Sequence, residues 1–217
     1  DSLAVHAGRE DFGSLSVHAP PLDLSTTYPI SDLAEGVESL EALAEGASSA
    51  PSPVYARLCN PTVARYEKAL ASLEGASDAV SFASGMAAIT ACLLAARAEG
   101  ARHVVALRPV YGGTDALLQS GVLGLEVTWA RPGEVAAALR PDTGLVFVES
   151  PANPLLSLVD IAAVVAEAGK VPVVVDSTFA TPVLQRPIAL GAAAVVHSAT
   201  KFLGGHGDVM GGLVACG

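Results

Sequence analysis

The sequence lacks basic charge and long hydrophobic runs, and both absences limit what the chain can bind. Twelve lysines and arginines stand against 22 acidic residues, which gives a formal net charge of -10. This balance disfavours nucleic acid and anionic membrane surfaces as partners. No apolar run reaches eighteen residues without a charge or a turn signal, so we expect a soluble protein without a transmembrane helix.

Cysteine is scarce as well. Cys59, Cys92 and Cys216 are scattered, odd in number and without metal-ligand spacing, so we predict no metal site and a reduced, cytoplasmic setting. The N-terminus has no basic region followed by an apolar one, and therefore no signal peptide is predicted. The chain begins without Met and stops inside a predicted strand, which favours a piece of a longer protein.

The chain is rich in a regular alternation of apolar strands and helices. Residues 1–50 are irregular, with short helix-like pieces. A helix is then predicted from Asn60, a capping residue, and Pro61 to Gly75. Strands are expected at 78–83, 103–107, 125–130, 144–149, 171–176, 193–197 and 212–216. Helices are expected at 85–98, 112–120, 133–139 and 158–168. This order predicts the α/β class, as a mostly parallel sheet in a three-layer αβα arrangement.

Only three lysines are present, and one of them has an unusual setting. Lys68 reads as the polar side of a helix and Lys170 as a helix-to-strand turn, whereas Lys201 follows a buried strand in a stretch rich in Gly, Ser and Thr. Asp176 ends another Val-rich strand, where a carboxylate is either a helix cap or a functional group. A lysine amine and a buried carboxylate are what pyridoxal 5'-phosphate needs, for a Schiff base and for a protonated ring nitrogen.

Several turns next to predicted strands offer groups that suit the same ligand. The turn at Ser84 and Gly85 begins a helix, and its free N–H groups suit a phosphate, although an ordinary tight turn has the same pattern. Ser198 and Thr200 lie just before Lys201, where their hydroxyls can reach a phosphate. Ligands in such sheets bind at the carboxyl ends of the strands, where these residues fall.

Aromatic and polar side chains complete the set of candidates. Tyr111 lies on a glycine turn at a strand end and can stack on a flat ring. Asn153, between two prolines, can hydrogen-bond a phenolic oxygen. Tyr55 and Arg57 point the same way if their segment is extended, and together they match phosphate oxygens.

Other classes of enzyme find little support in the sequence. A nucleotide- or nicotinamide-binding protein requires a glycine-rich fingerprint after its first strand, and neither a Walker A pattern nor GxGxxG occurs there. The Gly-x-Ser-x-Gly turn of a serine hydrolase is missing too. A non-catalytic relative, or a fragment that folds without turnover, remains an alternative.

Taken together, these motifs resemble the Cys/Met-metabolism family of pyridoxal phosphate enzymes. The resemblance runs through nearly the whole sequence, at residues 5–8, 24–28, 55–62, 84–88, 111–114, 176–179, 185–187 and 198–201. Two positions depart from the family pattern. Ser177 stands where Asn is usual, and Gly113 stands where bacterial methionine γ-lyases often carry Cys.

The resemblance implies a role for each matching position. Lys201 would form the Schiff base and Asp176 would pair with the ring nitrogen, while Tyr111 would stack on the ring and transfer protons. The implied cofactor-binding residues are Tyr55, Arg57, Gly85, Met86, Tyr111, Asn153, Asp176, Thr178, Ser198, Thr200 and Lys201. Tyr55 and Arg57 would reach the phosphate in a neighbouring subunit.

The same resemblance implies the assembly. Residues 1–55 would form an N-terminal arm that contacts a neighbouring subunit, and residues 56–217 would form a large domain of fold-type I. The C-terminal domain expected in the family is absent from this sequence. The protein would be a homo-oligomer, a dimer of dimers, with active sites shared between subunits.

The implied reaction is γ-elimination on a sulfur amino acid, cystathionine or methionine, which releases a thiol, a 2-keto acid and ammonia. The alternative is γ-replacement of the cystathionine γ-synthase or O-acetylhomoserine sulfhydrylase type. Both reactions use the same residues around the cofactor, so these motifs leave the two open.

Overall fold

The computed structural model describes residues 2–47 and 50–217 of the chain and divides into two compact units, Asp1–Leu73 and Glu74–Gly217. The first unit contains α1 (Ser2–His6), α2 (Phe12–Leu15), α3 (Leu33–Ala44) and nearly all of α4 (Pro61–Glu74).

In the first unit, side-chain caps explain where the longer helices begin. Asn60 accepts hydrogen bonds from the backbone N–H groups of Thr62 and Val63, so α4 starts at Pro61 as predicted. Asp32 caps α3 in the same way. This helix has 12 residues, so the expectation of only short helix-like pieces before residue 50 was wrong. The Arg65 guanidinium forms a two-pronged ion pair with Asp11.

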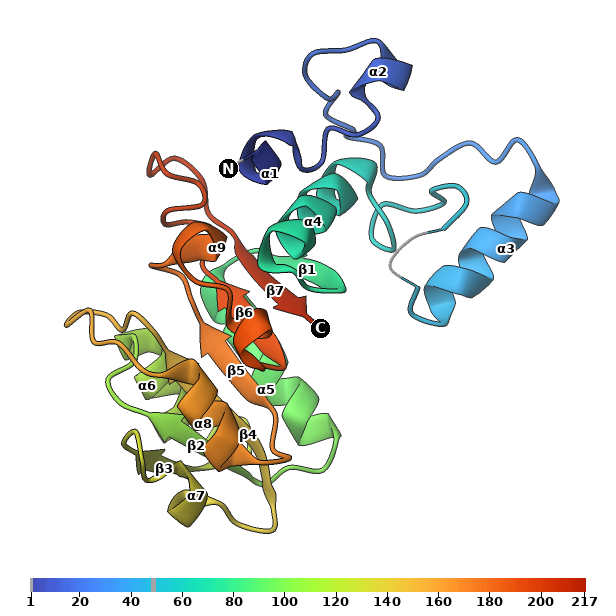
Figure 1. Ribbon diagram of the computed structural model, residues 1–217. Coiled ribbons are helices and arrows are strands. Elements are labelled where there is room, and N and C mark those ends of the chain that lie inside the picture. The colour runs from blue at the N-terminus through green and yellow to red at the C-terminus, as the bar shows by residue number, and fades with distance from the viewer. Residues whose placement is uncertain (1, 48–49) are drawn as a thin grey trace. The chain divides into compact units, whose positions relative to one another are not determined.

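The second unit is built on a seven-stranded sheet with the order β1-β7-β6-β5-β4-β2-β3 (Figure 1). Its strands are β1 (Asp78–Phe82), β2 (His103–Leu107), β3 (Glu126–Ala130), β4 (Thr143–Glu149), β5 (Val173–Asp176), β6 (Ala194–His197) and β7 (Gly212–Cys216). Strands β6, β5, β4, β2 and β3 are parallel, whereas β7 runs antiparallel to both β1 and β6. The predicted mostly parallel sheet is confirmed.

Helices cover both faces of this sheet. Helices α5 (Gly85–Ala98) and α6 (Gly112–Ser120) pack on one face, and α7 (Val135–Ala138) and α8 (Ile161–Ala168) pack on the other (Figure 1). Alternate residues of β4 serve the two cores, with Phe147 on the first face and Val146 and Val148 on the second. Because both faces are covered, all of β2 and the last five residues of β4 are buried, and most of them are apolar. The three-layer expectation is confirmed.

Two further short helices follow β5 and were not predicted from the sequence. They are α9 (Thr181–Leu184) and the 3-10 helix η1 (Pro187–Leu190). Each has only four residues, which is too short for a hydrophobic period to become visible. Within the described residues, the helices are all too short or too polar to cross a membrane.

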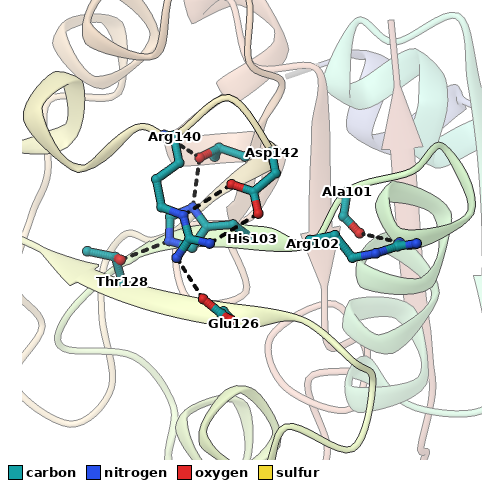
Figure 2. Close-up of polar contacts among 8 residues, drawn as sticks. Ala101, Arg102, His103, Glu126, Thr128, Arg140 and Asp142 are labelled. Atoms are coloured by element: carbon teal, nitrogen blue, oxygen red, sulfur yellow. Dashed lines mark hydrogen bonds and ion pairs between the residues drawn. The ribbon is translucent and has the colours of Figure 1, made fainter.

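The amino ends of β2, β3 and β4 carry a polar cluster around His103 (Figure 2). His103 is fully buried, and its ring nitrogens lie 2.7 Å from the Thr143 hydroxyl and 2.8 Å from the Thr128 hydroxyl. Burial, and secondarily the charge of Arg140, lowers the pKa of His103. Because both nitrogens of this neutral imidazole are hydrogen-bonded, His103 has a structural role at the amino ends of these strands.

Candidate functional site

A cavity of about 190 Å³ opens at the carboxyl ends of the parallel strands of the second unit. Segments that follow β1, β2, β4, β5 and β6 all contribute to its wall. The lining residues are Ser84, Gly85, Met86, Ile89, Tyr111, Glu149, Asn153, Asp176, Thr178, Phe179, Ser198, Thr200, Lys201 and Met210. All nine residues of the second unit that the sequence analysis predicted as site residues therefore line one cavity.

The turn between β1 and α5 forms one wall of this cavity. The Ser84 hydroxyl accepts a hydrogen bond from the Ala87 N–H and so caps α5. A side chain at Gly85 would place its Cβ 2.6 Å from the Cβ of Ser198, so only glycine allows the two segments to approach this closely. The N-terminus of the 14-residue helix α5 thus faces the cavity with its N–H dipoles, which favour an anion.

Residues 198–201, which follow β6, form the facing wall. His197, the last residue of β6, is fully buried, and its Nε2 lies 2.5 Å from Oε1 of the equally buried Glu74. The Thr200 hydroxyl exchanges hydrogen bonds with the backbone of Gly211. Because that contact uses the hydroxyl proton, Thr200 has acceptor rather than donor capacity left toward a ligand. Lys201 itself is exposed and lines the cavity.

Asp176 lies at the floor of the site, at the end of β5 and almost fully buried. Thr178 donates both its backbone N–H and its hydroxyl to Oδ1 of Asp176, at 3.0 and 2.5 Å. The same hydroxyl accepts the N–H of Ser198. Burial raises the pKa of Asp176, and the two bonds from Thr178 partly oppose that rise. A buried carboxylate of this kind is stabilised by a positively charged partner.

Tyr111 and Asn153 reach the cavity from the loops after β2 and β4. Tyr111 is the residue before α6, and a Cβ at Gly113 would come within 2.6 Å of its ring. The backbone N–H groups of Tyr111 and Asn153 both donate to the carboxyl of Glu149, the last residue of β4. Glycine at 113 therefore leaves room for the tyrosine ring in its present position.

Tyr55 and Arg57 belong to the first unit. Tyr55 forms an isolated bridge with Thr27 and then enters a turn, since its carbonyl accepts the N–H groups of Leu58 and Cys59. The expected extended segment is thus limited to Tyr55 itself. Both predicted side chains are exposed, and the Arg57 guanidinium carbon lies 5.2 Å from the Tyr55 ring centroid. The two side chains lie beside each other because of this turn, not because the segment is extended as predicted.

Sequence reasoning missed some residues of the cavity wall, above all Glu149. A signal was available, because Glu149 ends an apolar strand as Asp176 does, and the two residues are register partners on β4 and β5. Ile89, Phe179 and Met210 also line the cavity without having been predicted. Over residues 2–47 and 50–217, no cluster of His, Cys, Asp or Glu has the geometry to hold a metal ion.

Comparison with known proteins gives one consistent result. The L-methionine gamma-lyase of Streptomyces avermitilis is 60% identical over 217 residues, covering 100% of this chain and 52% of the relative. The O-succinylhomoserine sulfhydrylase of Pseudomonas aeruginosa is 41% identical, covering 99% of this chain and 53% of the relative. The crystal structure of cystathionine gamma-lyase from Lactobacillus plantarum complexed with L-serine superposes with a TM-score of 0.84 at 32% identity, covering 99% of this chain and 54% of that one.

The chain thus spans about half the length of the curated relatives it matches. A sequence model of the Cys/Met metabolism PLP-dependent enzymes matches residues 1–217, the whole of the sequence. The superposition on the cystathionine gamma-lyase structure, with its TM-score of 0.84, agrees with this match. The chain belongs to the Cys/Met metabolism PLP-dependent enzyme family.

Proposed function

We propose that the protein catalyses pyridoxal phosphate-dependent γ-elimination on a sulfur amino acid, methionine or cystathionine, giving a thiol, a 2-keto acid and ammonia. The observation that supports this most is the joint presence of Lys201, Asp176 and the Gly85 turn around one cavity. An amine, a buried carboxylate and an anion-binding helix end are the three groups that this cofactor requires.

The residues present fit the cofactor. The close approach of Gly85 to Ser198 forms a narrow backbone cradle at the start of α5, of the kind that binds phosphate. Burial raises the pKa of Asp176, and a protonated ring nitrogen beside this carboxyl group would favour its ionised form. When bound, pyridoxal phosphate supplies an aldehyde that takes up the substrate amine and a ring that withdraws electrons from Cα.

The residues that line the cavity have different roles toward the bound cofactor. Lys201 would hold the cofactor covalently, and its amine would move the proton at the substrate Cα. Asp176 would keep the ring nitrogen protonated, and Thr178 orients Asp176 through two hydrogen bonds. Tyr111 lines the cavity and would stack on the ring and transfer a proton at its phenolic oxygen. The backbone of Gly85 and Met86, with the Ser198 hydroxyl, would hold the phosphate, and Asn153 would bind the phenolic oxygen. Thr200 would join them when its hydroxyl turns from the Gly211 carbonyl oxygen, to which it donates at 3.2 Å, toward the phosphate.

γ-Elimination has more support than γ-replacement. The 60% identical relative is named an L-methionine gamma-lyase, whereas the relative named a sulfhydrylase is 41% identical. Both reactions proceed through loss of the γ-substituent. In γ-elimination water then releases the 2-keto acid and ammonia, whereas in γ-replacement a thiol nucleophile adds at Cγ. γ-Replacement on an activated homoserine is the second candidate function.

We propose further that the enzyme is a cytoplasmic homo-oligomer whose sites are shared between subunits. The exposed pair Tyr55 and Arg57 supports this, because a guanidinium beside a phenol suits the phosphate of a neighbouring subunit. The three cysteines are free, which is consistent with a reducing compartment.

The test is a product assay on the full-length protein with added pyridoxal phosphate. Methionine and cystathionine should each be tested for release of thiol and 2-keto acid. A parallel assay should supply an activated homoserine with cysteine and measure cystathionine. Thiol release without added nucleophile supports γ-elimination, and product formation only in the second assay would overturn it in favour of γ-replacement.

A further inference from the structure

Glu149 is a buried acidic residue at the proposed active site to which neither the motifs nor the proposed chemistry gives a role. It is 6% exposed, it ends β4, and it lies beside Asp176 in the register of the sheet. Its carboxyl group forms part of the cavity wall. Repulsion between two neighbouring carboxylates at the ends of adjacent strands destabilises the fold when both are ionised. A function of Glu149 at the site would explain why an acidic residue stands there.

The contacts of Glu149 define that role. Its Oε1 accepts the N–H of Asn153 at 2.7 Å, and its Oε2 accepts the N–H of Tyr111. One carboxyl group therefore joins the loop after β2 to the loop after β4, and each oxygen serves one loop. Both bonds go to backbone N–H groups that begin a turn or precede a helix, so they fix the backbone from which the two side chains reach the cavity.

Only the ionised carboxyl group can accept both bonds with full strength. A protonated carboxyl group carries an O–H that faces one of the two N–H donors, so one bond is weakened. The titratable groups that face the same cavity are Asp176 on β5, Tyr111 before α6 and Lys201 after β6. Burial, followed by the charge of Asp176, raises the pKa of Glu149 to about 7, and the two N–H donors partly oppose that rise. Its protonation therefore changes within the physiological pH range.

We infer that Glu149 is a positioning residue of the cofactor site: as a carboxylate it holds Tyr111 and Asn153 at the cavity, and on protonation it releases one of them. This inference rests on the proposed function for its consequence, which is a cofactor pocket whose organisation depends on pH. Its structural part, the tie between two loops, stands without the cofactor.

The first experiment measures that tie directly, by hydrogen exchange at the amides of Tyr111 and Asn153 in the full-length protein at pH 8.5. Glu149→Gln keeps the shape of the protonated side chain, and Glu99→Gln, exposed at the end of α5, is the matched control. We expect at least one of the two amides to exchange about tenfold faster or more in Glu149→Gln, as loss of a bond to a charged acceptor predicts. Changes below tenfold at both amides would overturn the inference.

A measurement on the unmodified protein covers the case in which the variant does not fold. After correction for the intrinsic pH dependence of exchange, protection of at least one of the same amides should fall about tenfold or more between pH 8.5 and pH 5.5. Protection that changes less than this at both amides contradicts a role for Glu149 ionisation.

The second experiment connects the tie to the cofactor. The dissociation constant of pyridoxal phosphate should be about tenfold larger in Glu149→Gln than in the unmodified protein at pH 8.5. At pH 5.5, where Glu149 is protonated, the two constants should agree. A ratio that is the same at both pH values contradicts the inference. If the unmodified protein binds no pyridoxal phosphate, the proposed function fails, whereas the exchange experiment still decides the tie between the loops.

Discussion

Replacing Glu149 with Gln should change how the stability of the cofactor-free protein depends on pH. Burial raises the pKa of Glu149 from 4.5 to about 7 in the folded protein. Because the folded-state pKa is the higher one, the folded protein binds more protons than the unfolded chain between these values. The contribution of Glu149 to stability is therefore fully present below pH 4.5 and is lost as the pH rises to 7.

The size of this effect follows from the two pKa values. At 1.36 kcal/mol per pH unit, the rise from 4.5 to about 7 corresponds to about 3.4 kcal/mol in total. Between pH 5 and pH 8.5 the part that is lost comes to about 2.5 kcal/mol, since the unfolded carboxyl group is already mostly ionised at pH 5. Glu149 is almost fully buried, so solvent screening leaves most of this value intact.

The assay is urea unfolding of the full-length protein, stripped of pyridoxal phosphate, at pH 5 and pH 8.5 and at one protein concentration. The free energy of unfolding of Glu149→Gln, relative to the unmodified protein, should rise by about 2.5 kcal/mol between the two pH values. Asp176 titrates in both proteins, so its contribution largely cancels. A relative stability that is independent of pH, or that falls as pH rises, would refute the reasoning.

The remaining predictions concern the proposed cofactor site. Lys201→Ala should prevent covalent attachment of the cofactor, so borohydride reduction and mass spectrometry should find no adduct; a full yield of adduct would contradict its role. Gly85→Ala should weaken pyridoxal phosphate binding about tenfold or more, because the new Cβ would lie 2.6 Å from that of Ser198. Gly112→Ala, with open space around its Cβ, is the control and should bind normally. Subunits carrying Arg57→Ala and subunits carrying Lys201→Ala, each inactive alone, should regain activity when assembled together, and no gain on mixing would argue against shared sites.

The sequence predicted the strands and the longer helices of the second unit closely. Continuous Val-rich runs of four to eight residues favour buried strands over helices, and Gly or Pro marks their ends. The direction of β7 was not predictable in the same way. Parallel and antiparallel strands have the same period of two, so residues 212–216 give no indication of their direction.

Residues of the cavity were predictable where their immediate sequence neighbours indicated a function, as with Lys201 and the turn at Gly85. Glu149 was missed because a Glu before Ser and Pro reads equally well as the start of an exposed turn. What distinguishes it is a pair of hydrogen bonds from Tyr111 and Asn153, which are 38 and 4 residues away. The contact with Tyr111 depends on how the strands are ordered in the sheet, and no local pattern in the sequence gives that order.

The position of β7 has a consequence for the order in which the protein can be assembled. β7 lies between β1 and β6, the strands that lead into the two walls around Gly85 and Ser198. At its start, a Cβ on Gly212 would come within 2.1 Å of the Ser84 carbonyl oxygen, so the backbone of β7 packs directly against the turn before α5. A ribosome delivers residues 212–216 after everything else in the sheet. Until they insert, a nascent chain contains the Gly85 turn and Ser198 but lacks the strand between β1 and β6 that brings these two segments together.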